Sequence, residues 1–227
     1  MLDSLIELDK ELLLFCNGIH FAWLDNFYWI VSSKYSNLLV IIPLLALLLR
    51  KKRLSETVFV IVGLVVVILL CDQFASSVCK PLFHRFRPTH DESISQFVHV
   101  VNNYRGGRYG FISSHSANAF GAAVFLLCVF RNRWFTAAIL FWAFLVSYSR
   151  IYLGVHFPGD ILAGAVVGSL IGGALYVAYK KIRMKFYVSG KLSSKEIPYR
   201  CDNYVTYFAG YVLLMFFVIA VVSVCML

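Results

Sequence analysis

Six long apolar runs, nearly free of charged residues, constrain this chain more than any other feature. They cover residues 36–49, 57–71, 116–130, 134–149, 161–179 and 204–227. With a few flanking residues, each run approaches the roughly 20 residues that a helix needs to cross a bilayer. Hydrophobic residues make up 60% of the chain, against about half in soluble domains. The sequence therefore predicts one all-α domain over residues 1–227, a polytopic membrane bundle of six transmembrane helices, with the last helix in residues 201–227.

The first 22 residues differ from these runs because acidic side chains alternate with leucines. Asp3, Glu7, Asp9 and Glu11 occupy a region that would be basic and then apolar in a cleavable signal peptide. The apolar residues form a broad face opposite the acids, which is typical of helices that lie in a membrane surface. We therefore expect residues 1–22 to form an interfacial helix.

The basic residues between the apolar runs predict the orientation of the chain. The formal net charge is +9, and Lys and Arg gather in alternate connections, at residues 50–53, 131–133 and 180–200. Such an excess marks cytoplasmic connections. The other connections should face outward, so we expect a multi-pass protein of the plasma (inner) membrane with its site on the outer (periplasmic or extracytoplasmic) face.

Three polar segments lie in the connections that are expected to face outward, at residues 80–88, 113–115 and 149–160. Lys80, Arg87 and Arg150 supply cations, and arginine can hold phosphate oxygens through two parallel hydrogen bonds. Ser113 and Ser114 precede an apolar run, where serine commonly caps a helix whose backbone N–H groups favour an anion. These segments, which span residues 80–160, predict a phosphate-binding site at the membrane surface.

Two histidines in these segments have different surroundings. Asp160 follows His156 by four residues across an expected helix start, so its carboxylate can hold one ring nitrogen and leave the other directed at phosphorus. His115 begins another helix without such a carboxylate and could protonate a departing oxygen. We interpret His156 as the nucleophile, Asp160 as its orienting group and His115 as the general acid.

Motifs for other kinds of site are missing from the sequence. It contains no zinc-ligand spacing, phosphate-binding Walker loop or dinucleotide fingerprint. We therefore expect no cofactor and no metal. Nothing in the sequence indicates a nucleic acid or a protein partner, so the expected partners are the bilayer and a phosphorylated membrane lipid.

The polar segments resemble the three signature motifs of the type 2 phosphatidic acid phosphatase family. Residues 80–88 and 149–160 match the first and third motifs, whereas the second has Ile112 and Ser114 where the family usually has proline and glycine. The resemblance implies a metal-independent lipid phosphatase with a helical core shared with vanadium haloperoxidases. It also implies a phosphohistidine at His156, oriented by Asp160, a leaving group protonated by His115, and phosphate bound by the remaining motif residues, Lys80, Arg87, Ser113, Ser114 and Arg150.

The choice of lipid stays open in the sequence. The Ser-Ser-His variant resembles the bacterial branch of undecaprenyl diphosphatases and lipid A phosphatases, while phosphatidylglycerophosphate and phosphatidic acid are alternative substrates. Two other classes of protein are also compatible with parts of the pattern. An intramembrane serine hydrolase would use Ser113 or Ser114 with His156 and Asp160, and a lipid-phosphate transporter would use the cations only to bind its cargo.

Overall fold

The protein is a bundle of long helices in which the described residues contain no β-strand, only one isolated bridge between Phe86 and Tyr109. The computed structural model describes residues 2–50, 54–192, 197–199 and 203–227. The α-helices are α1 (Leu2–Gly18), α2 (Ala22–Ser32), α3 (Lys34–Arg50), α4 (Leu54–Gln73), α5 (Lys80–Phe83), α6 (Ser114–Phe130), α7 (Arg133–Tyr152), α8 (Pro158–Val188) and α9 (Asn203–Cys225). The predicted all-helical class is confirmed. Residues 201 and 202 of the predicted last helix lie outside the described residues.

Four helical segments among the described residues are long and apolar enough to cross a membrane: Leu54–Phe83, α7, α8 and α9. The pair α2 and α3, bent by 53° at Ser33, would make a fifth. The helix α6 is apolar but has only 17 residues. The protein is therefore a multi-pass membrane protein by these criteria, and six crossings stay a prediction.

The helices expose apolar faces to their surroundings, as lipid contact requires. On α8, for example, Leu162, Val166 and Leu170 are 53% to 68% exposed and repeat every four residues along one side. Such a continuous apolar surface is rare on soluble proteins.

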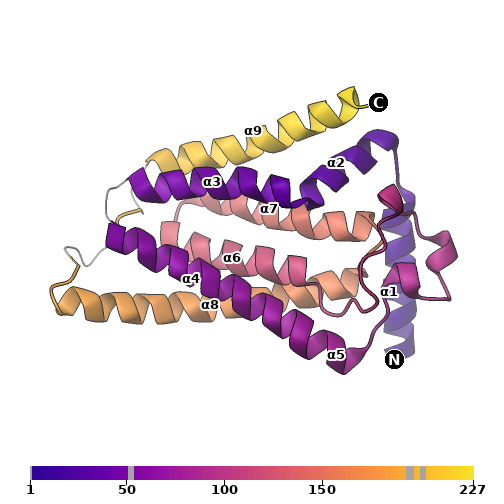
Figure 1. Cartoon of the computed structure of the whole chain (residues 1–227), viewed down its shortest axis with the longest axis horizontal. Helices are drawn as coiled ribbons and strands as arrows, with labels where there is room; N and C mark the ends of the chain where they lie inside the picture. The colour runs from indigo at the N-terminus through magenta and orange to yellow at the C-terminus, as the bar shows by residue number, and fades with distance from the viewer. Residues whose placement is uncertain (1, 51–53, 193–196, 200–202) are drawn as a thin grey trace.

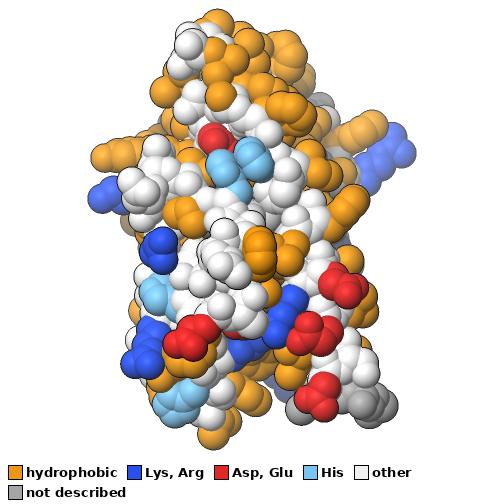
Figure 2. Space-filling view, turned by 90° about the vertical axis from the view of Figure 1, so that its right-hand side faces the viewer, with side chains coloured by type: hydrophobic (Ala, Val, Ile, Leu, Met, Phe, Trp, Pro, Cys, Tyr) orange, Lys and Arg blue, Asp and Glu red, His pale blue; other side chains and the backbone are white. Residues whose placement is uncertain are grey.

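The two ends of the bundle differ in their connections (Figure 1). The α3 C-terminus, the α8 C-terminus and the α9 N-terminus, which flank basic connections, lie at the left end of that view. The loop from residue 84 to residue 113 lies at the opposite end, where α1 runs across the ends of the other helices. Seen from this end, Lys, Arg, Asp, Glu and His side chains gather among polar atoms (Figure 2). The segment expected to be an interfacial helix, residues 1–22, contains the helix α1, which ends at Gly18, and the start of α2 at Ala22. Its location in the membrane surface stays a prediction.

A stripe of glycines brings α8 unusually close to α6. A Cβ atom at Gly168 would lie 2.2 Å from the Ala117 carbonyl oxygen, and one at Gly172 would lie 2.3 Å from that of Gly121. Small residues at four-residue spacing allow this approach between membrane helices. The stripe fixes the helix that carries Asp160 against the helix that carries His115.

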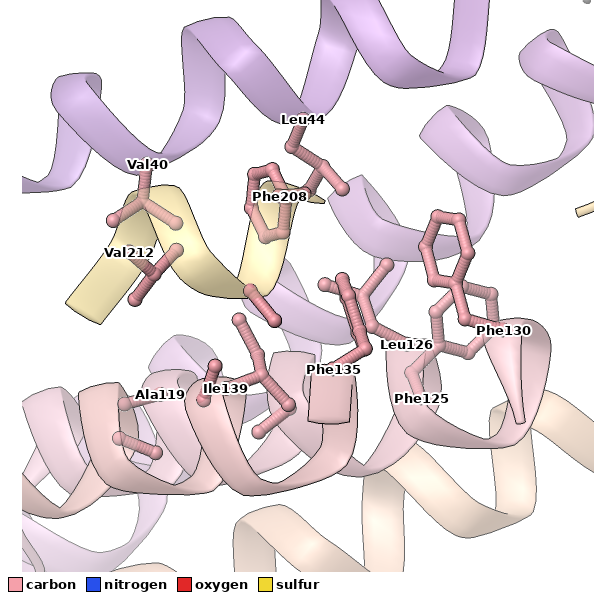
Figure 3. Close-up of a cluster of buried hydrophobic side chains, with 14 of the residues drawn as sticks. Val40, Leu44, Ala119, Phe125, Leu126, Phe130, Phe135, Ile139, Phe208 and Val212 are labelled. Atoms are coloured by element: carbon pink, nitrogen blue, oxygen red, sulfur yellow. The ribbon is translucent and has the colours of Figure 1, made fainter. Parts of the chain in front are cut away.

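Apolar side chains from the central helices fill the space between them (Figure 3). Leu126 and Phe130 of α6 meet Phe135 and Ile139 of α7, and Leu44 of α3 packs onto the same cluster. All five are at most 5% exposed. This core holds α6 and α7, whose outer ends carry site residues, in a fixed relation.

Candidate active site

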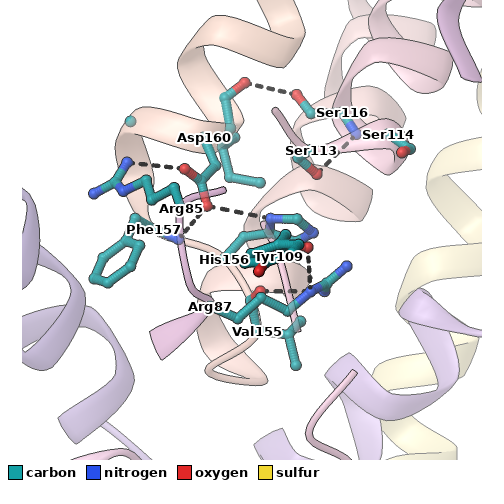
Figure 4. Close-up of polar contacts among 12 residues, drawn as sticks. Arg85, Arg87, Tyr109, Ser113, Ser114, Ser116, Val155, His156, Phe157 and Asp160 are labelled. Atoms are coloured by element: carbon teal, nitrogen blue, oxygen red, sulfur yellow. Dashed lines mark hydrogen bonds and ion pairs between the residues drawn. The ribbon is translucent and has the colours of Figure 1, made fainter. Parts of the chain in front are cut away.

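The two residues interpreted as nucleophile and orienting group meet at the N-terminus of α8. Phe157 caps this helix and Pro158 takes its first position, which suits the fixed φ of proline. The ring nitrogen Nδ1 of His156 lies 3.3 Å from Oδ2 of Asp160, which also accepts a hydrogen bond from the Phe157 N–H at 3.1 Å (Figure 4). His156 is 1% exposed and Asp160 is fully buried. The carboxylate therefore fixes the orientation of the ring through Nδ1.

A second carboxylate reaches this pair through an arginine that the sequence did not single out as a site residue. Arg85 donates one hydrogen bond to Asp160 Oδ1 at 2.9 Å and another to Asp9 Oδ2 at 2.6 Å. Asp9 in turn accepts a hydrogen bond from the Gly159 N–H at 2.7 Å. The helix α1 is thereby joined to the first turn of α8, beside His156.

Lys80 and Ser114 lie together although 34 residues separate them in the chain. The ammonium group of Lys80 donates hydrogen bonds to the hydroxyl oxygen of Ser114 at 2.8 Å and to that of Ser76 at 3.3 Å. A π-helical segment, Phe74–Cys79, precedes Lys80, and such segments are frequent at functional sites. The ammonium group is thus held at the N-terminus of α6.

Arg87 and Arg150 are nearly buried, at 8% and 3% exposure, and protein oxygens hold both. Arg87 donates to the backbone oxygens of Tyr109 and Val155 at 3.1 and 3.2 Å. Arg150 donates to the hydroxyl groups of Ser32 and Tyr104. No described carboxylate forms an ion pair with either guanidinium. Both keep an uncompensated positive charge, which an anion can match.

Ser113 acts as the N-cap of α6, as its position in the sequence suggested. Its hydroxyl oxygen accepts a hydrogen bond from the Ser116 N–H at 3.4 Å, and its own N–H donates to the Asp160 carbonyl oxygen at 3.1 Å. Its side chain is fully buried. The structure therefore gives this hydroxyl a capping contact at the point where α6 meets α8.

His115 is the last of the eight predicted site residues. It lies in the first turn of α6, is exposed to a cavity, and is within electrostatic range of His156, Lys80, Arg87 and Arg150. All eight residues predicted from the sequence are thus brought to one end of the bundle. Their catalytic and binding roles remain predictions.

The charges around His156 affect its protonation. Burial and the positive charges of Arg87, Arg150 and Lys80 hold the pKa of His156 well below its usual range. Burial also lowers the pKa of Arg87. A neutral imidazole has a free lone pair, so His156 is in the form that a nucleophile requires at neutral pH.

The site differs from a serine hydrolase triad. The Ser113 hydroxyl is held by the helix cap and that of Ser114 by Lys80, and neither hydroxyl is hydrogen-bonded to His156 in the described structure. A triad requires the base to be within hydrogen-bond reach of the nucleophile. The residues thus suit a histidine nucleophile facing an anion. The described residues contain no group of three or more His, Cys, Asp or Glu placed to bind a metal.

Known proteins are similar to this chain in sequence, and a solved structure is similar to it in fold. The chain is 38% identical over 185 residues to "Lipid A 4'-phosphatase" of Porphyromonas gingivalis, which covers 82% of this chain and 78% of that protein. It is 31% identical over 147 residues to "Undecaprenyl-diphosphatase" of Sulfolobus acidocaldarius, covering 64% of this chain and 66% of the relative. The crystal structure of Aquifex aeolicus LpxE superimposes with a TM-score of 0.57 at 27% identity, over 76% of this chain and 96% of LpxE.

The sequence profile of the PAP2 superfamily matches residues 57–184, which include every predicted site residue. This match confirms the family resemblance noted in the sequence, and the relatives agree with it. The chain belongs to the PAP2 superfamily and is a phosphoric ester hydrolase.

Proposed function

We propose that this protein is a metal-independent phosphatase that removes phosphate from a membrane lipid through a phosphohistidine at His156. One observation carries the proposal: the His156–Asp160 pair is buried beside three cations that have no carboxylate partner among the described residues. The site therefore combines a fixed, neutral nucleophile with a positive pocket for the phosphate oxygens.

The reaction proceeds in two displacements. In the first, the negative charge of the bound phosphate offsets the cations and lets His115 hold a proton. The ring nitrogen of His156 that does not face Asp160 attacks phosphorus, the bond from phosphorus to the lipid oxygen breaks, and His115 gives its proton to that oxygen. In the second, water attacks the phosphohistidine, His115 takes a proton from the water, and inorganic phosphate leaves. Asp160 accepts a hydrogen bond from Nδ1 of His156 throughout, and stabilises the charge that develops on the ring.

The cations would bind the phosphate oxygens in both steps. Arg87, Arg150 and Lys80 are within electrostatic range of His156, and the N-terminus of α6 adds backbone N–H groups near Ser114. Ser114 is tied to Lys80, so its hydroxyl would position the ammonium group or contact phosphate directly.

A phosphomonoester of a lipid A type glycolipid is the substrate we favour. The support is the 38% identity to the Porphyromonas gingivalis enzyme over 82% of this chain, against 31% over 64% for the undecaprenyl-diphosphatase. Undecaprenyl diphosphate is the second candidate. Phosphatidylglycerophosphate and phosphatidic acid have no such relative among these proteins.

We also propose six crossings of the inner membrane, with the site on the outer face. The basic connections support this orientation. The pair α2 and α3 would be the first crossing and α6 the third. With 17 residues α6 is about 26 Å long, somewhat less than the roughly 30 Å of bilayer hydrocarbon. Its N-terminus would then lie slightly below the outer surface, where the phosphate of a membrane lipid can reach it.

Phosphate release by the purified protein in detergent, with EDTA present, tests the proposal. The substrates are lipid A, undecaprenyl diphosphate, phosphatidylglycerophosphate and phosphatidic acid. We expect release from lipid A, inhibition by vanadate and no release by His156→Ala. Loss of activity in EDTA would contradict the metal-independent reaction. A His156→Ala variant that still moves lipid phosphate across vesicles would instead favour a transporter, and labelling by a fluorophosphonate that stops turnover would favour a serine hydrolase.

A further inference from the structure

A cavity of about 320 Å³ lies between α3, α4, α6 and α7 and extends from the candidate active site into the bundle. Its size is at the low end of the roughly 300–1,000 Å³ typical of ligand sites. Along α6 it is lined by one face of the helix, at His115, Asn118, Ala119, Ala122 and Leu126. From His115 to Leu126, a stretch of twelve residues, the helix rises by about 16 Å. The cavity is therefore long enough for part of a lipid chain.

The two ends of this cavity differ in polarity. Near the site it is lined by Ser114, His115, Asn118, Asn37 and Asp72. Farther along, its walls are aliphatic side chains, among them Leu44, Leu64, Leu126 and Ile139. Leu126 and Ile139 belong to the buried core shown in Figure 3, so they limit how deep a ligand can reach. The cavity thus suits a molecule with a polar head and an apolar tail.

The position of His115 indicates which part of the substrate lies in the cavity. Under the proposed function, on which this inference rests, His115 protonates the oxygen of the departing lipid. Because His115 lines the cavity, the group attached to that oxygen should lie beside it. The cavity is on the leaving-group side of the phosphate.

Asp72 indicates that the leaving group carries a hydrogen-bond donor. Its carboxylate lines the cavity and forms no hydrogen bond or ion pair with any residue that the structure describes. Lys80 is within electrostatic range but makes its hydrogen bonds to Ser114 and Ser76. A polyprenyl chain has no hydrogen-bond donor and would cover this carboxylate with hydrocarbon, at a large desolvation cost. An O–H or N–H group would satisfy it.

Two further residues that line the cavity carry polar atoms without a hydrogen-bond partner among the described residues. Asn118 Oδ1 and Trp142 Nε1 are buried and have no hydrogen-bond partner within the described part of the chain, and both residues line the cavity. Asn118 Oδ1 is a hydrogen-bond acceptor and Trp142 Nε1 is a donor. A polar group on the ligand is the partner that such atoms ordinarily have in native sites.

We propose that this cavity binds the leaving-group portion of an acylated lipid, with its hydrocarbon chain along α6 and an O–H or N–H group hydrogen-bonded to Asp72. The cavity then selects acylated lipids over polyprenyl lipids that present the same phosphate.

Three phosphate esters with different leaving groups test this selection: phosphorylated lipid A, undecaprenyl phosphate and p-nitrophenyl phosphate, which has no chain. The measured quantity is the ratio of kcat/KM for each lipid to that for p-nitrophenyl phosphate. Leu64→Trp fills the cavity and should lower the lipid A ratio at least tenfold. Val65→Trp, on the outer face of the same helix, is the matched control and should leave it unchanged. Equal ratios in the two variants would contradict a chain in the cavity.

Replacing Asp72 tests the hydrogen bond separately. Asp72→Leu should lower the lipid A ratio about 10- to 100-fold, the effect of one hydrogen bond to a charged group, and should not lower the undecaprenyl phosphate ratio. Asp72→Asn keeps an acceptor oxygen and should recover part of the loss. A parallel fall for both lipids would overturn the selection.

Binding to the inactive enzyme separates this inference from the proposed function. In a His156→Ala background, Asp72→Leu should weaken the equilibrium binding of phosphorylated lipid A about 10- to 100-fold. This result would support the cavity even if phosphate release by the wild-type protein did not require His156. Unchanged binding would contradict the cavity even if His156 proved to be the nucleophile.

Discussion

Arg85 and Asp160 are joined by a hydrogen bond of 2.9 Å, on the carboxylate oxygen that does not face His156 (Figure 4). Because Arg85 also binds Asp9 of α1, it links the partner of the His156 ring to a residue that lies 147 positions before His156 in the chain. Arg85 further stacks on the Phe157 ring, 4.2 Å from its centre. We predict that Arg85 is a positioning residue, which would act on His156 through Asp160.

Arg85→Gln should therefore lower kcat about 10- to 100-fold, which corresponds to one lost hydrogen bond to a charged group, with little change in KM. Arg85→Lys, which keeps the charge, should recover part of the loss. Arg108→Gln is the matched control, because Arg108 lies over the Phe86 and Tyr109 rings outside this network. An Arg85→Gln variant that alters KM alone would contradict a positioning role.

His115 should matter more for a lipid alcohol than for a good leaving group. Nitrophenolate departs without a proton, whereas a lipid alkoxide does not, so only the lipid reaction needs a general acid in its first step. His115→Ala should lower kcat/KM for phosphorylated lipid A at least tenfold more than for p-nitrophenyl phosphate under single-turnover conditions. An equal loss for both substrates would assign His115 to phosphate binding.

The depressed pKa of His156 predicts the acid limb of the pH profile. The groups that act on it are Arg87, Arg150, Lys80 and the Asp160 carboxylate. Because burial and then the cations oppose the imidazolium, His156 should stay neutral at pH values below about 6.5, the usual histidine pKa. We therefore expect kcat/KM to fall only at more acidic pH. Arg87→Gln removes one positive charge and should raise the pKa of His156, measured by NMR of labelled imidazole. A pKa that falls in this variant would contradict the electrostatic explanation.

The glycine stripe should be intolerant of side chains only where α6 is close. Gly168→Ala would place Cβ 2.2 Å from the Ala117 carbonyl oxygen, so the helices must separate, at a cost of about 1–3 kcal/mol or more. Gly173→Ala is the control on the same helix, since a Cβ there meets nothing within 4 Å. The thermal midpoint in detergent should fall for Gly168→Ala and hold or rise for Gly173→Ala. Equal midpoints would show that α6 and α8 are less tightly packed than the structure indicates.

The sequence was most informative where a local pattern decides the structure. Pro158 and Asp160 follow His156 closely, so the helix start and its pairing were predictable from short spacings. The capping role of Ser113 and the glycine stripe of α8 were predictable for the same reason. Each depends on contacts within one turn or along one helix face.

Features formed between distant segments were not predictable in this way. Arg85 and Asp9 are 76 residues apart, and nothing local distinguishes Arg85 from the other arginines of the loop. The bend at Ser33 and the position of Asp72 in the cavity likewise depend on how helices pack. Six crossings are not confirmed, because α6 has 17 residues and the sequence suggested a helix of roughly 20.

Trapping the phosphoenzyme tests the central claim most directly. The wild-type protein is mixed with phosphorylated lipid A, quenched in base within the first turnover, digested, and examined by mass spectrometry for phosphate on histidine, which is stable in base. We predict phosphate on the peptide that contains His156, and none in His156→Ala or after prior treatment with vanadate. Phosphate on His115 or on a serine, or full turnover by His156→Ala, would contradict the account.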